Sequence, residues 1–355
     1  MAHLIKVFDL CTPQEKYKLF LILIFSIVTA LLEMIGIALV LPVLSILLSN
    51  NIENTQLIFF NFDLNFLRNF FFGNVLFNGL FLLVSAFIVK NIFLILFNFY
   101  HNKFTNDISQ RMSEALFLKY LRKNFSFFLK VNTNELLKNC MYVVDRFRES
   151  FNHIIICISE IIVLLGITLI LIVYEPQGFL LSLVFLGTLG GFVILTSSKI
   201  NAKWGTEILK NEKERYLHLS QAFSGIREIK VFNKVNFFFK KFIPSNARRF
   251  KISYLHFWVS SLPKFIIEVF FILTLAFLLI FFKLDGKANF EIVTIMGLFA
   301  VASLRIMPSL NRILRSFQRI KFGQASVDIL HNELNKSKLP EDSLSSDLQT
   351  NKKKD

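Results

Sequence analysis

Six charged side chains stand inside long apolar runs of this sequence. Each would cost about 2.5–3.5 kcal/mol if its run crossed a lipid bilayer, so each is by default a candidate functional group. The lysines could instead reach the membrane surface through their long stems, and Arg305 could pair with Glu33 or Glu268. The three acidic residues are better explained as ion-pair or helix-packing partners than as proton carriers. The six residues are Lys90, Lys264, Arg305, Glu33, Glu160 and Glu268.

Two basic stretches separate the apolar runs, and the second has a clear helical pattern. Residues 101–150 contain nine Lys or Arg residues and residues 199–258 contain thirteen, so neither stretch can lie in hydrocarbon. From Leu209 to Phe232, apolar residues recur at the spacing of one helix face. We therefore predict that helices continue beyond the membrane and turn back in the cytosol, near 124–134 and near 216–225.

The composition favours a membrane protein over several other classes. The chain has 355 residues, is 54% hydrophobic and carries a net charge of +15. Basic soluble domains that bind nucleic acid are not this apolar, so we expect no nucleic-acid partner. The three cysteines form no CxxC pair and the histidines lack ligand spacing, which predicts neither a disulfide framework nor a metal site. The first apolar run has no cleavage site, so we expect it to be retained.

Six apolar runs are long enough to cross a bilayer. We predict spans at about 19–48, 75–100, 151–174, 179–196, 262–282 and 290–307. Placing the two basic loops and both termini in the cytoplasm leaves only Arg68, Lys283 and Lys287 outside, as the positive-inside rule requires. The fold class expected is an all-α membrane protein with six transmembrane helices and long cytosolic helical extensions.

Two further segments differ in composition from both the apolar runs and the basic stretches. Residues 50–74 are aromatic-rich and dotted with acids, which favours an amphipathic segment lying on the outer membrane surface. Residues 331–355 end in EDSLSSDLQTNKKKD, a polar composition typical of a disordered tail. The folded domain is therefore expected over residues 1–330.

This arrangement resembles the transmembrane half of an ABC exporter. SGIREIKVFNKVNFFFKKF (224–242) resembles the stretch after the second coupling helix of those permeases. NFSFFLKVNTNELL (124–137) resembles their first coupling-helix region, although the usual glycine after the asparagine is missing. LLEMIGIALVLP (31–42) and ASLRIMPSLNRILRSFQRIKFG (302–323) are closer to one branch, the lipid-linked oligosaccharide flippases. The outer amphipathic segment also resembles the external helix of that branch.

The resemblance implies a permease subunit in the bacterial inner membrane. It would dimerise with a second transmembrane half, identical or different, and move a lipid-linked oligosaccharide or a similar amphipathic lipid. It also implies a positively lined cavity, in which Lys90, Lys264 and Arg305 would bind the diphosphate of the lipid. The coupling region that would dock on an ATPase subunit comprises Phe127, Phe128, Asn132, Tyr216, Leu219, Phe223 and Gly225.

Arg312, Arg315 and Arg319 recur at three and four residues, on one helix face at the cytoplasmic boundary. Contact with a lipid or substrate phosphate and plain positive-inside anchoring explain this face equally well.

One departure from the branch concerns ATP hydrolysis. Its members usually carry an ATPase domain after the segment that corresponds to Leu330, but this sequence has no G-x-x-x-x-G-K-[ST] loop to hold a nucleotide. We expect the chain to be no enzyme on its own and to bind no cofactor, with ATP and Mg²⁺ held by a partner domain. The alternatives are a permease for peptides or drugs, and a truncated or split-gene fragment without transport activity.

Overall fold

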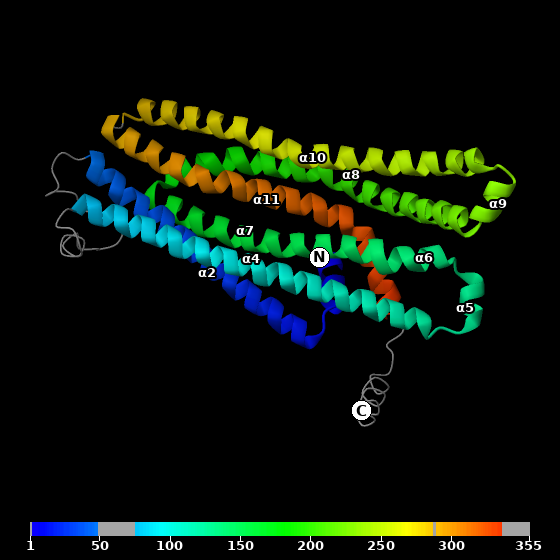
Figure 1. Ribbon diagram of the computed structural model, residues 1–355. Coiled ribbons are helices and arrows are strands. Elements are labelled where there is room, and N and C mark those ends of the chain that lie inside the picture. Colours follow the sequence, from blue (N-terminus) through cyan, green and yellow to red (C-terminus); the bar gives the residue numbers. More distant parts are fainter. Residues whose placement is uncertain (1, 49–74, 287–288, 336–355) are drawn as a thin grey trace, which may run out of the picture.

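The computed structural model describes residues 2–48, 75–286 and 289–335, and the regular structure in these ranges is entirely helical. Long helices run side by side in an elongated bundle (Figure 1). They are α2 (Pro13–Leu48), α4 (Val75–Leu121), α7 (Val144–Tyr174), α8 (Pro176–Ser224), α10 (Val235–Leu284) and α11 (Asn289–Asn335). The predicted all-α fold class is confirmed.

Shorter helices complete the described chain. They are α1 (Ala2–Asp9), α5 (Phe125–Lys130), α6 (Thr133–Lys138), α9 (Ile226–Val231) and a π-helical segment, η2 (Asn139–Val143), that leads directly into α7. Helices α5 and α9 lie at the same end of the bundle, where the long helices turn back (Figure 1).

Local chemistry explains where two of the long helices begin. The backbone N–H of Thr12 donates to Oε2 of Glu15 at 2.8 Å, and the N–H of Glu15 donates to Oγ1 of Thr12 at 3.3 Å. This capping box satisfies free donors at the start of α2, and Pro13 takes the first helical position. Pro176 opens α8 in the same way, so that Glu175 alone separates α8 from α7.

Four helices continue furthest beyond the length that a bilayer requires. α4, α8, α10 and α11 have 47, 49, 50 and 47 residues, whereas about 20 are enough to cross. The predicted helical extensions are therefore present. The first turn also lies where it was expected, because α4 ends at Leu121 and α6 begins at Thr133.

The second turn comes later than predicted. Residues 216–224 still belong to α8, and the chain turns through α9 and reaches α10 at Val235. The apolar spacing of α8 continues unbroken to its end, so that spacing alone does not mark where the helix stops. The actual breaks are at Gly225, which caps α8, and at Asn233, which adopts a φ of 51° after α9. A positive φ is tolerated by asparagine better than by most residues.

The length and composition of the described helices support part of the predicted span pattern. Stretches 13–36, 77–121, 133–169 and 235–284 are long and apolar enough to cross a membrane. Some side chains of the predicted spans 179–196 and 290–307 lie outside the described residues. The count of six spans stays a prediction.

Two other predictions fall largely outside the described residues. The expected outer segment 50–74 lies wholly outside them, and so do residues 336–355 of the expected tail. The expected tail begins too early, however, because α11 continues through 331–335. The buried Leu330 and the contact of His331 with Asp9 show that packing against α1 stabilises this last turn.

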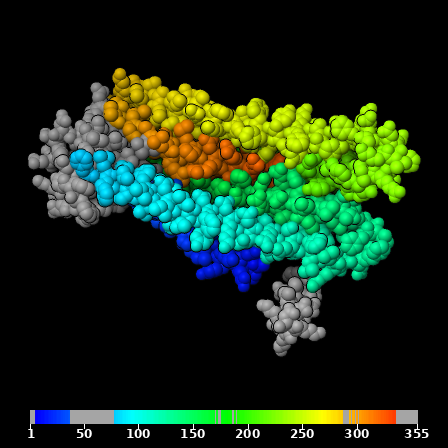
Figure 2. Space-filling model, viewed as in Figure 1, coloured from blue at the N-terminus to red at the C-terminus, as the bar shows by residue number. Residues whose placement is uncertain are grey.

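The buried core has two main parts. One cluster joins α1, α4, α7 and the end of α11 around the fully buried Met112 and Phe147. A second joins α2, α7, α8, α10 and α11 around Leu278 and Phe282. By contrast, α4 runs along the surface (Figure 2), and none of its apolar window is buried in protein. This helix therefore exposes a long apolar face to its surroundings.

Candidate functional site

Four of the charged residues on α2, α7 and α11 form one ion-pair cluster inside the bundle. Arg305 approaches Oε2 of Glu33 with both Nη2, at 2.5 Å, and Nε, at 2.6 Å. Nε of Arg312 lies 2.8 Å from Oε1 of Glu160, and Nη2 of Arg305 lies 3.7 Å from Oε2 of the same carboxylate. We call Glu33, Glu160, Arg305 and Arg312 the charge cluster.

The members of the charge cluster differ in exposure. The side chains of Glu33 and Glu160 are 4% and 10% exposed, whereas those of Arg305 and Arg312 are 22% and 45% exposed. A buried carboxylate needs a partner because its desolvation costs several kcal/mol. Arg305 supplies that partner for Glu33. The sequence left Glu33 and Glu268 as possible partners of Arg305, and the structure shows that the partner is Glu33.

Lys90 lies beside this cluster. Its Cδ is 3.9 Å from the position of a Cβ on Gly36, close to Glu33 along α2. Its Nζ stands 4.3 Å from the centre of the Phe87 ring, and it forms no ion pair with any described residue. Three cations therefore gather around two carboxylates, leaving one positive charge without a matching acid.

The remaining two intramembrane charges lie apart on α10. Lys264 and Glu268 are exposed, and neither pairs with a residue that the structure describes. Nζ of Lys264 is 5.9 Å from the centre of the Phe265 ring. The structure thus places Lys90 near Arg305, Glu33 and Glu160, but gives neither Lys264 nor Glu268 an ion pair with a described residue.

The predicted arginine face of α11 divides into two kinds of contact. Arg312 and Arg319 turn toward α7, where Nη1 of Arg319 lies 3.6 Å from Oε2 of Glu149. Arg315 is exposed and has no ion pair among the described residues. The pairing of Arg312 with Glu160 was not predicted, although the spacing of seven residues between Arg305, Arg312 and Arg319 was a usable signal, since it keeps them on nearly the same helix face.

The predicted coupling residues lie at or near the two far turns. The Phe127 ring packs against Tyr120, with centroids 6.4 Å apart, and against Phe128 at 5.5 Å. Asn132 caps α6 by accepting a hydrogen bond from the Asn134 N–H at 2.9 Å. These contacts fix the first turn.

At the second turn the predicted residues occupy the end of α8. Tyr216 and Leu219 precede the turn, Phe223 is exposed and Gly225 caps the helix. Burial, together with the nearby Glu212 carboxylate, raises the pKa of the Tyr216 phenol. Lys213 on α8 also reaches Oε2 of Glu135 on α6, at 2.7 Å, which links the two excursions.

Four other exposed apolar residues at these turns were not named individually among the predicted coupling residues, although two of them lie within the predicted stretch 124–134. Phe125 and Leu129 on α5, and Val231 and Phe232 at the end of α9, are 69–78% exposed. Solvent-exposed apolar side chains gathered at one end of a bundle are typical of a docking surface. We call these four residues the tip residues.

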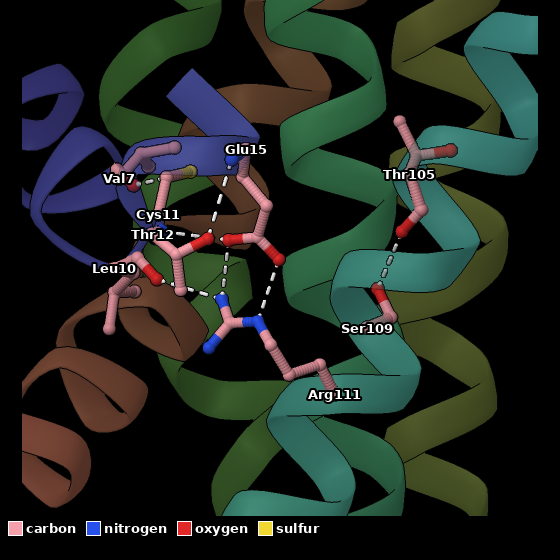
Figure 3. A network of polar contacts seen from close by, with 8 residues as sticks. All are labelled: Val7, Leu10, Cys11, Thr12, Glu15, Thr105, Ser109 and Arg111. Carbon is pink, nitrogen blue, oxygen red and sulfur yellow. Dashed lines mark hydrogen bonds and ion pairs between the residues drawn. The ribbon is translucent and has the colours of Figure 1, made fainter. Parts of the chain in front are cut away.

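A separate polar network anchors the beginning of α2 to α4 (Figure 3). Arg111 donates from Nε to Oε1 of Glu15 at 2.6 Å, and from Nη2 both to Oε2 of Glu15 at 2.8 Å and to the carbonyl oxygen of Leu10 at 3.0 Å. Cys11, next to this network, is buried, and burial reinforced by Glu15 raises the pKa of its thiol to about 11. The network holds α1 and α2 in place and carries no reactive group.

No group of His, Cys, Asp and Glu suited to a metal ion occurs among the described residues.

The comparison with protein families agrees with the long helices, the paired far turns and the apolar exterior. The family model for the ABC transporter transmembrane region matches residues 19–306. The match covers most of the chain, from the first span through Arg305. The chain is a multi-pass membrane protein that belongs to the ABC transporter transmembrane region family.

Proposed function

We propose that this protein is the permease subunit of an ATP-driven flippase that moves an amphipathic lipid with an acidic head, such as a lipid-linked oligosaccharide. One observation carries the proposal: Arg305 and Arg312 contact two carboxylates, Glu33 and Glu160, and a third cation, Lys90, lies nearby beside Gly36. Such an excess of positive charge among apolar helices favours an anionic ligand.

The charge balance suits a diphosphate head group. Removing such a group from water is unfavourable unless fixed cations offset the loss, and opposite charges a few ångströms apart attract strongly at intermediate dielectric. Arg305 is largely occupied by Glu33, whereas Arg312 is half exposed and Lys90 has no acid partner among the described residues. Lys90 and Arg312 are therefore the first contacts we assign to the head group, and Lys264 extends them on α10.

The shape of the helices supports an ATP-driven mechanism. The two excursions place the tip residues at one end of the bundle (Figure 1), and the first excursion leads through α6 and η2 into α7, the helix that carries Glu160. Members of this family pair with a nucleotide-binding subunit. We assign ATP and Mg²⁺ to that partner, and propose that the tip residues dock on it and transmit its movement.

The test is transport in proteoliposomes that contain the permease together with the nucleotide-binding subunit that co-purifies with it. A radiolabelled glycolipid with a diphosphate linkage should cross the bilayer when ATP is supplied. Lys90→Ala should reduce its rate at least about tenfold, since a charge contact within a low-dielectric site is lost. Lys251→Ala, an exposed lysine on α10 outside the predicted spans, is the matched control and should transport normally.

Two outcomes would contradict the proposal. Equal transport of a neutral amphiphile would favour the peptide or drug exporter, and normal glycolipid transport by Lys90→Ala would remove the role of the cations. A further control separates the subunits: the permease purified alone should hydrolyse no more ATP than a mock preparation.

A further inference from the structure

Glu160 occupies an unusual place in the charge cluster. It is buried, with 8% of the residue exposed, and lies between the guanidinium groups of Arg305 and Arg312. Its Oε2 is inaccessible to solvent and makes no hydrogen bond with a described residue. A buried oxygen without a hydrogen bond costs about 1–3 kcal/mol, and the nearest charged partner of this one is the Arg305 guanidinium, at 3.7 Å.

Arg312, the other partner in this contact, also has N–H donors that are not used in hydrogen bonds with described residues. Its Nε lies 2.8 Å from Oε1 of Glu160, yet none of its N–H groups has a well-oriented hydrogen bond to a described residue. A guanidinium has five N–H donors in a fixed fork that matches two oxygens of a phosphate. With 45% of its side chain exposed, Arg312 can be reached by a ligand without displacing a tight pair.

A comparison of Glu160 with Glu33 identifies which carboxylate an incoming anion can displace more easily. Glu33 accepts two close contacts from Arg305 through one oxygen, at 2.5 and 2.6 Å, and is 4% exposed. The closest contact of Glu160 with Arg312 joins Oε1 to Nε at 2.8 Å, and its contact with Arg305 is longer, at 3.7 Å. Exchange of the carboxylate for another anion is therefore easier at Arg312 than at Arg305.

We propose that Glu160 is an internal competitor for the substrate's phosphate: it neutralises Arg312 in the empty permease and gives way when an anionic head group arrives. In that complex the freed Glu160 carboxylate pairs with Arg305 instead. Because this negative charge stays close to the site, the anion is not held too tightly. Glu160 is thus a positioning residue that sets both affinity and release. The inference rests on the proposed function, because it requires an acidic substrate.

This role predicts that removing the charge of Glu160 raises the affinity for an anion, whereas a variant that damages the fold would lower it. Glu160→Gln removes the competing charge but keeps the size of the side chain, so Arg312 should bind an anion more tightly. Loss of a carboxylate so close to the binding nitrogen should raise affinity about tenfold. A residue with only a structural role would lower affinity or leave it unchanged.

The experiment measures equilibrium binding of tritiated farnesyl diphosphate to the purified full chain in neutral detergent. Farnesol, which has the same apolar chain without the phosphates, is the control ligand. Glu160→Gln should bind the diphosphate about tenfold more tightly than the wild type and should bind farnesol equally well. Glu160→Asp should restore ordinary affinity. Glu268→Gln, which alters an exposed acid on α10, is the matched control and should change nothing.

The double variant Glu160→Gln/Arg312→Ala identifies the cation involved. It should lose the gain, because the nitrogen that benefits is gone. Unchanged or weaker binding by folded Glu160→Gln, a gain that persists in the double variant, or binding that is equal for farnesol and its diphosphate would each overturn the inference. These results are separable from the proposed function, which fails when ATP drives no glycolipid transport, whatever the binding assay shows.

Discussion

Gly205 on α8 lies against the backbone carbonyl oxygen of Phe322 on α11, so closely that a Cβ on Gly205 would overlap it. The Phe322 ring in turn stacks on the imidazole of His256 on α10, with ring centres 4.0 Å apart. Three of the long helices are therefore fixed to one another at this level. The close approach involves backbone on one side, so no side-chain rotation can relieve a larger residue.

Gly205→Ala should consequently destabilise the protein. Alanine favours a helix by about 1 kcal/mol over glycine, but overpacking against a rigid neighbour costs about 1–3 kcal/mol and exceeds that gain. Thermal unfolding followed by size-exclusion chromatography in detergent should show a lower midpoint. Gly190→Ala, on the same helix with no atom within 4 Å of a Cβ, is the control and should be neutral or slightly stabilising. Equal midpoints for both variants would contradict the close packing of α8 on α11.

The bidentate contact of Arg111 with Glu15 supports a second prediction. Hydrogen bonds to charged groups contribute about 1.5–3 kcal/mol each before coupling is considered, and Glu15 also caps α2. Arg111→Lys should lower the unfolding midpoint, because a lysine cannot form both contacts. Combining it with Glu15→Gln should add less than the sum of the two single effects. Fully additive losses would show that the two side chains act independently.

The sequence was sufficient for the helices and their approximate turns, because apolar runs and basic loops are both local patterns. It could not assign partners to the charges. Arg305 had two plausible acids, and which one lies opposite depends on how α2, α10 and α11 are rotated in the bundle. The pairing of Arg312 with Glu160 depends on the same packing. Residues 216–224 were misplaced at the turn because the α8 pattern continues unchanged through them.

Cys11 should be an unreactive thiol in the folded protein. Its pKa is raised from 9.0 to about 11 by burial and by Glu15, and only the thiolate reacts with maleimides. In a variant with Cys140→Ser and Cys157→Ser, labelling at pH 7.5 should be slow in mild detergent and fast after denaturation in SDS. Because the folded state retains this proton, the associated stability is complete below pH 9 and is lost as the pH rises toward 11. Rapid labelling at neutral pH would show that α1 does not cover the thiol.

The last prediction concerns Arg305, whose contact with Glu33 is the tightest in the charge cluster. Arg305→Ala should leave a carboxylate that is 4% exposed without its partner, and breaking one side of a buried pair typically costs about 3–5 kcal/mol. We therefore expect low expression and early thermal unfolding, rather than a stable protein that merely fails to transport. Lys264→Ala, which removes an exposed cation with no described acid partner, is the matched control and should express normally.

The cause can be isolated by removing the charge that Arg305 leaves behind. Glu33→Gln combined with Arg305→Ala should recover most of the lost stability, since no unpaired charge then remains inside the bundle. Transport of the diphosphate-linked lipid by this double variant, assayed with the nucleotide-binding subunit present, then reports on substrate binding alone. Substantial transport would assign anion binding to Lys90 and Arg312, with Arg305 as their structural neighbour. A stable Arg305→Ala single variant would instead show that the ion pair with Glu33 contributes little to the stability of the bundle.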